Sequence, residues 1–426
     1  MIRFAVPPTA DLSLDDFKIA LLSYIVAEQK KEDFIIRFED LNLKKNDEDK
    51  EQEILGILEL FGIQYSQVIH QSKNFRFHSA MALQLLHEKK AFSCFCSNEW
   101  LENKRSEAKE SNIEYKYDDA CMNLPAELVI DNTNPFTIRI KKSTNDIVAN
   151  DLVLGEKTFL SKDAESFIVM NHDKTPTQTF ANAVDEILND TSYIIRNEIN
   201  IKETPKELHI LSSLKYEKDI TFVHLPKISN QEKKQLSVKS LLELGYLPSS
   251  ILNYVISSIF TVPKDIYTLE EAIEWFNIEK ISTSPIEFDI ETLKKINRVH
   301  LNNLDAKELS RYVGFADEEI GNLAKLHLES IATTKELNNA ISTIFSEKKS
   351  PPENLNNEFK TIISLIKNAP YFDQFDDFKN YLLTNSDIDE SSLTSILDRI
   401  LRAGNSKVSL SESYKYLKNY LGEIVK

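Results

Sequence analysis

Short apolar strands alternate with amphipathic helices in the first third of the chain, and this order restricts the fold more than any other feature. Residues 2–4 and 34–38 have the composition of buried strands. Residues 17–29 between them carry apolar side chains at helical spacing, and residues 51–61 and 81–89 predict two further helices. A strand–helix–strand order predicts a parallel sheet of Rossmann type, whose ligand crevice lies at the carboxyl ends of the strands.

The pattern changes twice further along the chain. It is irregular from about residue 96 to 134, after which strands are predicted over residues 135–140 and 166–170. A helix over residues 180–188 and a strand over 193–196 follow, and from Leu241 onward the sequence reads as almost entirely helical. The order predicts an α/β domain with an insertion, followed by an all-α domain.

Composition sets limits on the class of protein. The chain has 426 residues, a net charge of −16 and no apolar run of membrane length, which predicts a soluble, cytoplasmic protein with more than one core. Three cysteines cannot form a disulfide framework. The acidic balance provides no general attraction to nucleic acid, so RNA binding would need a local basic face.

Residues 3–16 read RFAVPPTADLSLDD, and they resemble the opening of the glutamyl-tRNA synthetases. That class I family carries R-F-A-P-S-P-T-G-x-L-H-I/V-G, whose "HIGH" histidine and glycines meet the ATP phosphates. In this chain Ala10, Ser13 and Asp15 replace the first glycine, the histidine and the next glycine. The resemblance therefore implies the fold, while the altered residues predict weak or absent ATP binding.

The resemblance continues in fixed order over about residues 1–300. The matching segments are RFED at 37–40, QS at 71–72, PTQTFA at 176–181, VD at 184–185, IR at 195–196, HLP at 224–226, LGYLP at 244–248 and LNY at 252–254. They imply that Arg3 and Glu39 touch the glutamate substrate and that Arg196 binds its side-chain carboxylate. Gln178 stands where the family has a tyrosine that lines the amino-acid pocket.

Two carboxylates stand at the start of the first predicted helix. Asp15 and Asp16 would stabilise the helix by capping free N–H groups and opposing its dipole. The same carboxylates would repel a triphosphate, by roughly 4 kcal/mol for each charge pair at an effective dielectric constant near 20. The sequence thus predicts a stable helix whose N-terminus no longer binds a nucleotide.

The second family signature is altered as well. The family carries K-M/L-S-K-R on a mobile loop, and its lysines stabilise charge on the transferring phosphates. Residues 234–239 read KQLSVK, so in the simplest register Gln235 and Val238 replace the two lysines and Lys239 is one position out. Degenerate positions in both signatures favour a protein that has lost ATP-dependent activation.

All three cysteines are candidates for one metal site. Cys94 and Cys96 are one residue apart, and Cys121 follows about 25 residues later, a spacing that can converge on tetrahedral zinc. The resemblance implies a structural zinc in the inserted region, with Tyr117 as the alternative fourth ligand because Asn123 replaces a histidine of some members. The other interpretation is three reduced structural cysteines.

These observations define one interpretation with alternatives. We expect a Rossmann-type (HUP-like) catalytic domain over residues 1–303, with an insertion at about 92–180 and a stem-contact-like region at about 215–303, then a helical anticodon-binding-like domain over 304–426. The leading hypothesis is a monomeric pseudo-synthetase that binds tRNA weakly or binds a protein partner, with no membrane association. The alternatives are an active glutamate–tRNA ligase and a different reaction on glutamyl-tRNA.

Overall fold

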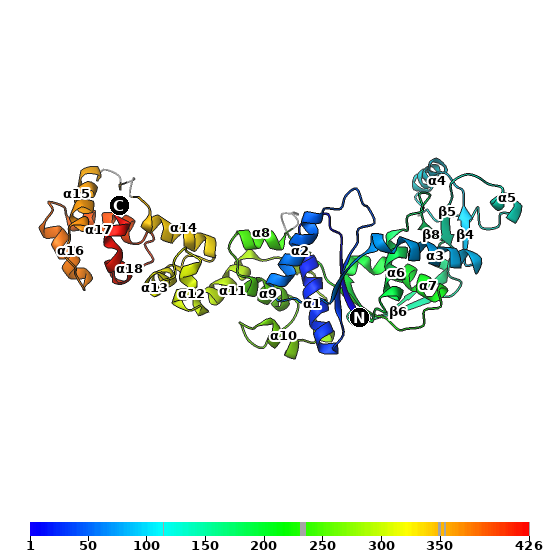
Figure 1. The fold of residues 1–426 in the computed structure, drawn as a ribbon, viewed down its shortest axis with the longest axis horizontal. Coiled ribbons are helices and arrows are strands. Elements are labelled where there is room, and N and C mark those ends of the chain that lie inside the picture. Colours follow the sequence, from blue (N-terminus) through cyan, green and yellow to red (C-terminus); the bar gives the residue numbers. More distant parts are fainter. Residues whose placement is uncertain (114, 231–235, 348–350, 353–354, 426) are drawn as a thin grey trace. The chain divides into compact units, whose positions relative to one another are not determined.

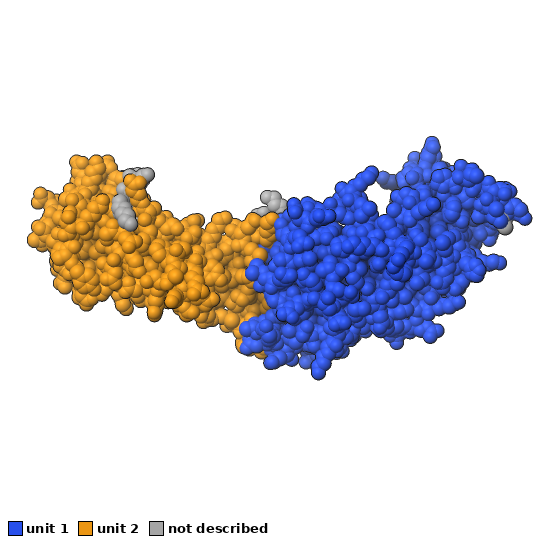
Figure 2. Space-filling view, in the orientation of Figure 1, with its two compact units in different colours: residues 1–238, 256–261, 268–288 blue, residues 239–255, 262–267, 289–426 orange. Residues whose placement is uncertain are grey.

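The structure is a computed structural model that describes all residues except 114, 231–235, 348–350, 353–354 and 426. The chain divides into two compact units, coloured separately in Figure 2. Unit 1 comprises residues 1–238, 256–261 and 268–288, and unit 2 comprises residues 239–255, 262–267 and 289–426. The predicted domain boundary near residue 303 stays a prediction.

A mostly parallel sheet of seven strands forms the centre of unit 1 (Figure 1). Its order is β3-β2-β1-β9-β10-β6-β7, and every pairing is parallel except the hairpin of the last two strands. The strands are β1 (Ile2–Val6), β2 (Phe34–Phe38), β3 (Gln67–His70), β6 (Ile147–Asp151), β7 (Gly155–Phe159), β9 (Tyr193–Asn197) and β10 (Thr221–Leu225). This sheet confirms the predicted Rossmann-type fold, and it brings the carboxyl ends of β1, β9 and β10 together.

Helices connect these strands in the predicted alternation. They are α1 (Leu14–Lys30), α2 (Glu48–Leu60), α3 (Phe75–His87), α6 (Gln178–Leu188) and α7 (Thr204–Ser213). Helix α1 begins at the N-cap Ser13 and ends at Lys31, which adopts a left-handed conformation with φ of 55°. Nearly the whole of α1 is buried, because the helix packs on β1 and β2 and also contacts α10 (Leu269–Trp275).

The inserted region contains its own small sheet. Strands β4 (Ala91–Cys94), β5 (Thr137–Ile140) and β8 (Phe167–Met170) form an antiparallel sheet in the order β4-β5-β8. Helices α4 (Asn98–Glu110) and α5 (Ala126–Ile130) lie in the segment where the sequence pattern is irregular. The β6–β7 hairpin lies between β5 and β8 in the sequence but belongs to the central sheet. Its strand β6 pairs with β10 through Asp151 and Phe222.

After β10 the chain becomes helical, as the sequence predicts. The remaining elements are β11 (Ile228–Ser229), α8 (Val238–Glu243), α9 (Pro248–Ser257), α10, β12 (Ile286–Glu287), α11 (Ile290–Asn303), α12 (Ala306–Arg311), α13 (Glu318–His327), α14 (Thr334–Phe345), α15 (Asn356–Lys367), α16 (Phe375–Thr384), α17 (Glu390–Leu401), α18 (Leu410–Leu417) and α19 (Leu421–Ile424). None of the helices in the described part of the chain combines the length and the apolar character that a membrane span needs.

Unit 2 is held by one apolar core that runs through α11 to α19. Gly321 of α13 allows the closest helix contact, because a Cβ atom at this position would lie 1.7 Å from the carbonyl oxygen of Ala306 in α12. Helix α14 begins with a capping box in which Thr333 and Glu336 satisfy each other's backbone N–H groups.

Candidate functional site

Six charged side chains meet around strands β1, β2 and β9, and we call them the arginine cluster. Its members are Arg3, Arg37, Glu39, Glu186, Arg196 and Glu207. The three arginines come from β1, β2 and β9, Glu186 from α6, and Glu207 from α7. Parallel strands side by side place residues of distant sequence at one edge, which explains why three arginines meet here.

Glu186 joins two of the arginines. Arg3 Nε donates to Glu186 Oε1 at 3.0 Å, and Arg37 Nη1 donates to the same oxygen at 2.9 Å. Burial alone would raise the pKa of Glu186, but the charges of Arg3 and Arg37 lower it to about 2. This carboxylate is therefore ionised throughout the neutral range and compensates for much of the positive charge in the cluster.

Glu39 lies at the accessible side of the cluster. Its Oε1 lies 3.7 Å from Arg37 Nη2, and its side chain keeps 21% of its exposure, whereas that of Arg37 keeps none. Burial raises the pKa of Glu39, against the opposing charges of Arg37 and Arg3, and the nearby carboxylates Glu207 and Glu186 raise it further. The side chain is therefore partly accessible, and its contact with the substrate stays a prediction.

Arg196 is bound on all sides by protein groups. Its Nε donates to His224 Nε2 at 3.1 Å, its Nη1 to Glu207 Oε1 at 2.9 Å, and its Nη2 to Thr204 Oγ1 at 2.9 Å. Glu207 Oε2 lies 2.8 Å from Nη2, so the two groups form a close ion pair with one hydrogen bond, to Oε1. Sequence reasoning singled out Arg196 but missed Glu207, which stands in none of the matching segments, and it gave no role to His224, which opens the matching segment HLP.

Gln178 reaches the cluster through α6. Its Nε2 donates to Gln71 Oε1 at 2.7 Å and to Asn182 Oδ1 at 2.9 Å, and Asn182 Oδ1 also accepts from Arg37 Nη2 at 3.3 Å. Gln178, Asn182 and Glu186 are four residues apart and share one face of α6. A polar stripe at this spacing on an otherwise amphipathic helix is the sequence signal that could have identified Glu186.

A separate cavity of about 550 Å³ lies at the start of α1, and we call it the α1 pocket. Its charged lining residues, within the described chain, are Asp15, Asp16 and Lys227. The other lining residues are Ser13, Leu14, Asn197, Ile199, Ile228, Ser229, Asn230, Leu236 and Phe288. The pocket is at the crevice where the sheet topology places a ligand, next to the N-terminus of a long helix.

Asp15 does not have the role that the sequence suggests. Its Oδ1 accepts from Lys18 Nζ at 2.6 Å and from the backbone N–H of Ile228 at 2.9 Å, and Lys18 also donates to the carbonyl of Pro226. The expectation of a capping carboxylate that repels phosphate was therefore wrong for Asp15. A buried lysine one helical turn away neutralises the charge, and a sequence reading of the helix start alone overlooked it.

Ser13 and Asp16 form the actual cap of α1. Ser13 Oγ accepts from the backbone N–H of Asp16 at 3.0 Å and donates to Asp16 Oδ2 at 2.6 Å. Burial raises the pKa of Asp16, and the hydrogen bond from Ser13 opposes this shift. Ser13 thus uses the histidine position of the family signature for a helix cap.

The two signature segments lie side by side. Leu14 N donates to Leu236 O at 2.8 Å and Val238 N donates to Leu12 O at 2.9 Å, around an antiparallel bridge between Ser13 and Ser237. Val238 is fully buried, so a lysine at that position could not reach a phosphate without rearrangement. Gln235, the other predicted signature position, lies outside the described residues.

The cysteines converge as predicted. The sulfur atoms of Cys94, Cys96 and Cys121 all lie within 4.8 Å of one another, and the hydroxyl of Tyr117 lies 3.3 Å from Cys94 Sγ and 3.4 Å from Cys96 Sγ. Arg139 Nε donates to Cys94 Sγ at 3.3 Å. This donor set fits a structural zinc ion, which prefers thiolate ligands.

The thiols of this group differ in acidity. Burial alone would raise the pKa of Cys94, but hydrogen bonds from Tyr117, the Cys96 backbone and Arg139 lower it to about 7. Burial raises the pKa of Cys96 to about 12. One thiol is thus prepared to be a thiolate near neutral pH, and metal binding would have to displace protons from the other ligands.

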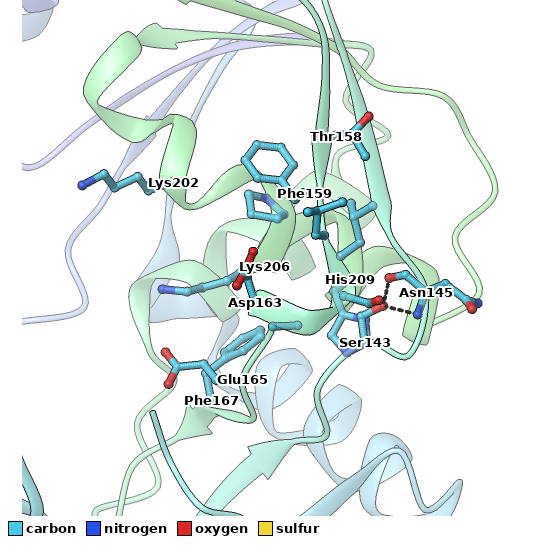
Figure 3. A pocket seen from close by; sticks show the side chains of 15 residues that line it. Ser143, Asn145, Thr158, Phe159, Asp163, Glu165, Phe167, Lys202, Lys206 and His209 are labelled. Atoms are coloured by element: carbon cyan, nitrogen blue, oxygen red, sulfur yellow. Dashed lines mark hydrogen bonds between the residues drawn. The ribbon is translucent and has the colours of Figure 1, made fainter. Parts of the chain in front are cut away.

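A third hollow, of about 420 Å³, lies between the β6–β7 hairpin, β8 and α7 (Figure 3). Its walls are mainly apolar and include Phe159 and Phe167, while Lys202 and Lys206 are among its charged lining residues. Ser143 closes a local turn at its edge, where its Oγ donates to Asn145 O at 2.7 Å. The sequence predicted no site here, because the hairpin itself was not predicted.

Comparisons with known proteins agree on one family. Residues 1–295 match the sequence model of the tRNA synthetases class I (E and Q), catalytic domain. The chain is 50% identical to glutamate–tRNA ligase 2 of Sulfurimonas denitrificans and 40% identical to glutamate–tRNA ligase 1 of Nitratiruptor sp., each over 100% of both chains. The crystal structure of a glutamate tRNA ligase from Elizabethkingia meningosepticum has a TM-score of 0.81 at 20% identity and covers 99% of this chain and 97% of its own.

Proposed function

The chain belongs to the class I tRNA synthetases of the E and Q type, and we propose that it is an active glutamate–tRNA ligase. The observation that carries this proposal is the 50% identity, over the full length of both chains, to a protein named glutamate–tRNA ligase 2. The reaction would first join a carboxylate oxygen of glutamate to the α-phosphorus of ATP, releasing pyrophosphate. A hydroxyl of the tRNA terminal ribose would then take the glutamyl group and release AMP.

The hypothesis of a pseudo-synthetase is unsupported. It depended on the replaced signature residues, yet chains that match this one from end to end are named as ligases. The structure removes part of the physical argument too, because the Asp15 charge is neutralised by Lys18. The alternative from the sequence, an active ligase, is therefore the better interpretation.

The arginine cluster supports glutamate as the amino acid. Arg3, Glu39 and Arg196 lie within one group of charges, and a guanidinium is suited to bind a carboxylate of the substrate. We propose that Arg3 receives the side-chain carboxylate and that Glu39 receives the amino group. Gln178 would close the site from α6, where it is already tied to Asn182.

The α1 pocket is the proposed nucleotide site. Its position next to the N-terminus of α1 suits phosphate, and Lys227 adds a positive charge to its lining. We propose that the backbone at Ser13 and the side chain of Lys227 share the charge stabilisation that two signature lysines give in the family. ATP binding is then expected, at an affinity reduced by Asp16.

The tRNA is proposed to bind along unit 2 as well as at the catalytic unit. Among the described residues of unit 2, Arg298, Lys325 and Lys407 line a hollow of about 420 Å³ together with Glu329 and Glu412. These three basic side chains, in a chain of net charge −16 and beside two glutamates, lead us to expect moderate binding that weakens as salt rises. A gel-shift titration of total tRNA at low and physiological salt tests this, and the absence of a shift at both would favour a protein partner.

The decisive experiment is aminoacylation by the full chain. Purified protein is incubated with ATP, labelled glutamate and total tRNA, and both acid-precipitable glutamyl-tRNA and ATP–pyrophosphate exchange are measured. Arg3→Gln should lower the rate by about 100-fold, since one substrate-binding charge is lost, while the exposed Glu217→Gln is the matched control. If wild-type protein is at background in both measurements, the ligase proposal is rejected.

A further inference from the structure

The side chain of Arg196 donates to three protein acceptors. A guanidinium carries five N–H groups, and the hydrogen bonds to His224, Glu207 and Thr204 use three of them. The second Glu207 oxygen lies beside the guanidinium without a hydrogen bond. The charge of Glu207 also cancels that of Arg196 at a distance of 2.8 Å.

A second acid, Asp151, holds Arg196 through His224. Arg196 Nε can only donate, so His224 Nε2 must accept, and the proton of the ring therefore lies on Nδ1. Nδ1 donates to Asp151 Oδ2 at 2.6 Å, and the backbone N–H of His224 donates to the same oxygen at 3.0 Å. Asp151 and His224 thus set the orientation of the guanidinium, and Glu207 sets its charge.

Arg3 has fewer hydrogen-bond partners than Arg196. Its Nε donates to Glu186 and its Nη1 makes a long contact of 3.5 Å with the carbonyl of Ile195. No acceptor in the described chain contacts its Nη2. The negative charge of Glu186 is moreover shared between Arg3 and Arg37, so the positive charge around Arg3 is only partly cancelled.

We propose that Glu207 is a positioning residue that sets how strongly the site selects a charged amino acid, because it holds and neutralises Arg196 and leaves Arg3 to receive the substrate carboxylate. This rests on the proposed function, in that the arginine cluster is taken as the amino-acid site. Glu207 does not touch the substrate. It acts through Arg196 and through its negative charge near Glu39 and the bound glutamate.

Glu207→Gln tests the proposal with little change of shape. Glutamine keeps an oxygen to accept from Arg196 Nη1, but it removes the negative charge, so Arg196 gains unpaired positive charge beside the amino acid. The KM for glutamate should fall by about tenfold, the size of effect expected for one charge-assisted contact. The kcat and the KM for ATP should stay unchanged, and the KM for glutamine, which carries no side-chain charge, should change much less.

The matched control is Glu203→Gln, which removes a carboxylate at the start of the same helix. Glu203 contacts Thr179 and Lys206 and lies outside the arginine cluster. A fall in glutamate KM in both variants would reveal a general electrostatic effect and overturn the role of Glu207. An unchanged or raised glutamate KM in Glu207→Gln, with the melting temperature retained, would overturn it as well.

Glutamate-dependent thermal shift provides a readout that does not need catalysis. If wild-type protein forms no glutamyl-tRNA but Glu207→Gln binds glutamate about tenfold more tightly than wild type, the ligase proposal fails and the role of Glu207 stands. If wild-type protein is an active ligase and Glu207→Gln alters neither glutamate binding nor KM, the ligase proposal stands and the role of Glu207 fails.

Discussion

The arginine cluster and the α1 pocket lie in the same unit and at the same sheet, yet their charged side chains are paired differently. In the cluster, three guanidinium groups meet three carboxylates in a mostly buried network. In the α1 pocket, the charged lining residues of the described chain are two aspartates and one lysine, and Asp15 is paired with Lys18 beneath the surface. The comparison shows that the net charge that a ligand meets depends more on which side chains are already paired than on how many side chains are charged.

Removing the shared acid of the cluster should have the largest effect. Glu186→Gln leaves Arg3 and Arg37 buried beside each other with no shared anion. Loss of one partner of a buried pair costs about 3–5 kcal/mol of unfolding free energy, which chemical denaturation can measure. The exposed Glu217→Gln is the control, and a loss below about 1 kcal/mol for Glu186→Gln would mean that the cluster does not hold the fold.

The same acid predicts a pH dependence of stability. The pKa of Glu186 is lowered to about 2 from an ordinary value near 4.5. A group with a lowered folded-state pKa contributes stability above its unfolded value, and this contribution is lost as pH falls from about 4.5 towards about 2. Unfolding free energies of wild-type protein should drop in this window more steeply than those of Glu186→Gln.

Asp15→Ala should show that the α1 pocket also contains a buried ion pair. The change leaves the fully buried Lys18 without its carboxylate, at a cost of about 3 kcal/mol. The double variant Asp15→Ala/Lys18→Met should recover most of this loss, because the uncompensated charge is gone. A single variant as stable as wild type would restore the view that Asp15 is a free surface carboxylate.

The cysteine group is the third site, and there a metal ion would balance the negative charge of the thiolates. We expect about one equivalent of zinc in the purified chain, and Cys96→Ala should weaken zinc binding by at least about 100-fold. Arg139→Gln, which removes a donor to Cys94 while keeping all three thiols, should weaken it by about tenfold. Metal content and chelator competition measure both, and three freely titrating thiols in metal-free, fully folded wild-type protein would reject the site.

Asp16→Asn should have the smallest effect and should act on ATP alone. The amide that replaces the carboxylate keeps an oxygen to accept from Ser13, while a negative charge that lines the α1 pocket is removed. The KM for ATP should fall by about fivefold, or roughly 1 kcal/mol, with the KM for glutamate unchanged. A rise in the KM for ATP would indicate that Asp16 binds a cation that accompanies the nucleotide.

Much of the fold followed from local patterns. The helix predicted over residues 17–29 became α1 (Leu14–Lys30), and the strand predicted over 34–38 became β2 (Phe34–Phe38), because both are largely apolar segments that the fold buries almost completely. The β6–β7 hairpin escaped prediction. Its outer strand is largely exposed, so it lacks the apolar alternation on which a sequence reading depends.

The sequence by itself determined the family, the alternation of strands and helices in the first third of the chain, and the cysteine group, because motif order, hydrophobic periodicity and ligand spacing are properties of the chain. Only the tertiary structure decided which charges of the site are paired. Lys18 neutralises Asp15, Glu186 joins Arg3 to Arg37 across 183 and 149 residues, and Glu207 neutralises Arg196. The physical reason is that Coulomb interactions depend on distance and burial, and parallel strands joined by long crossovers bring together charges that no local pattern connects.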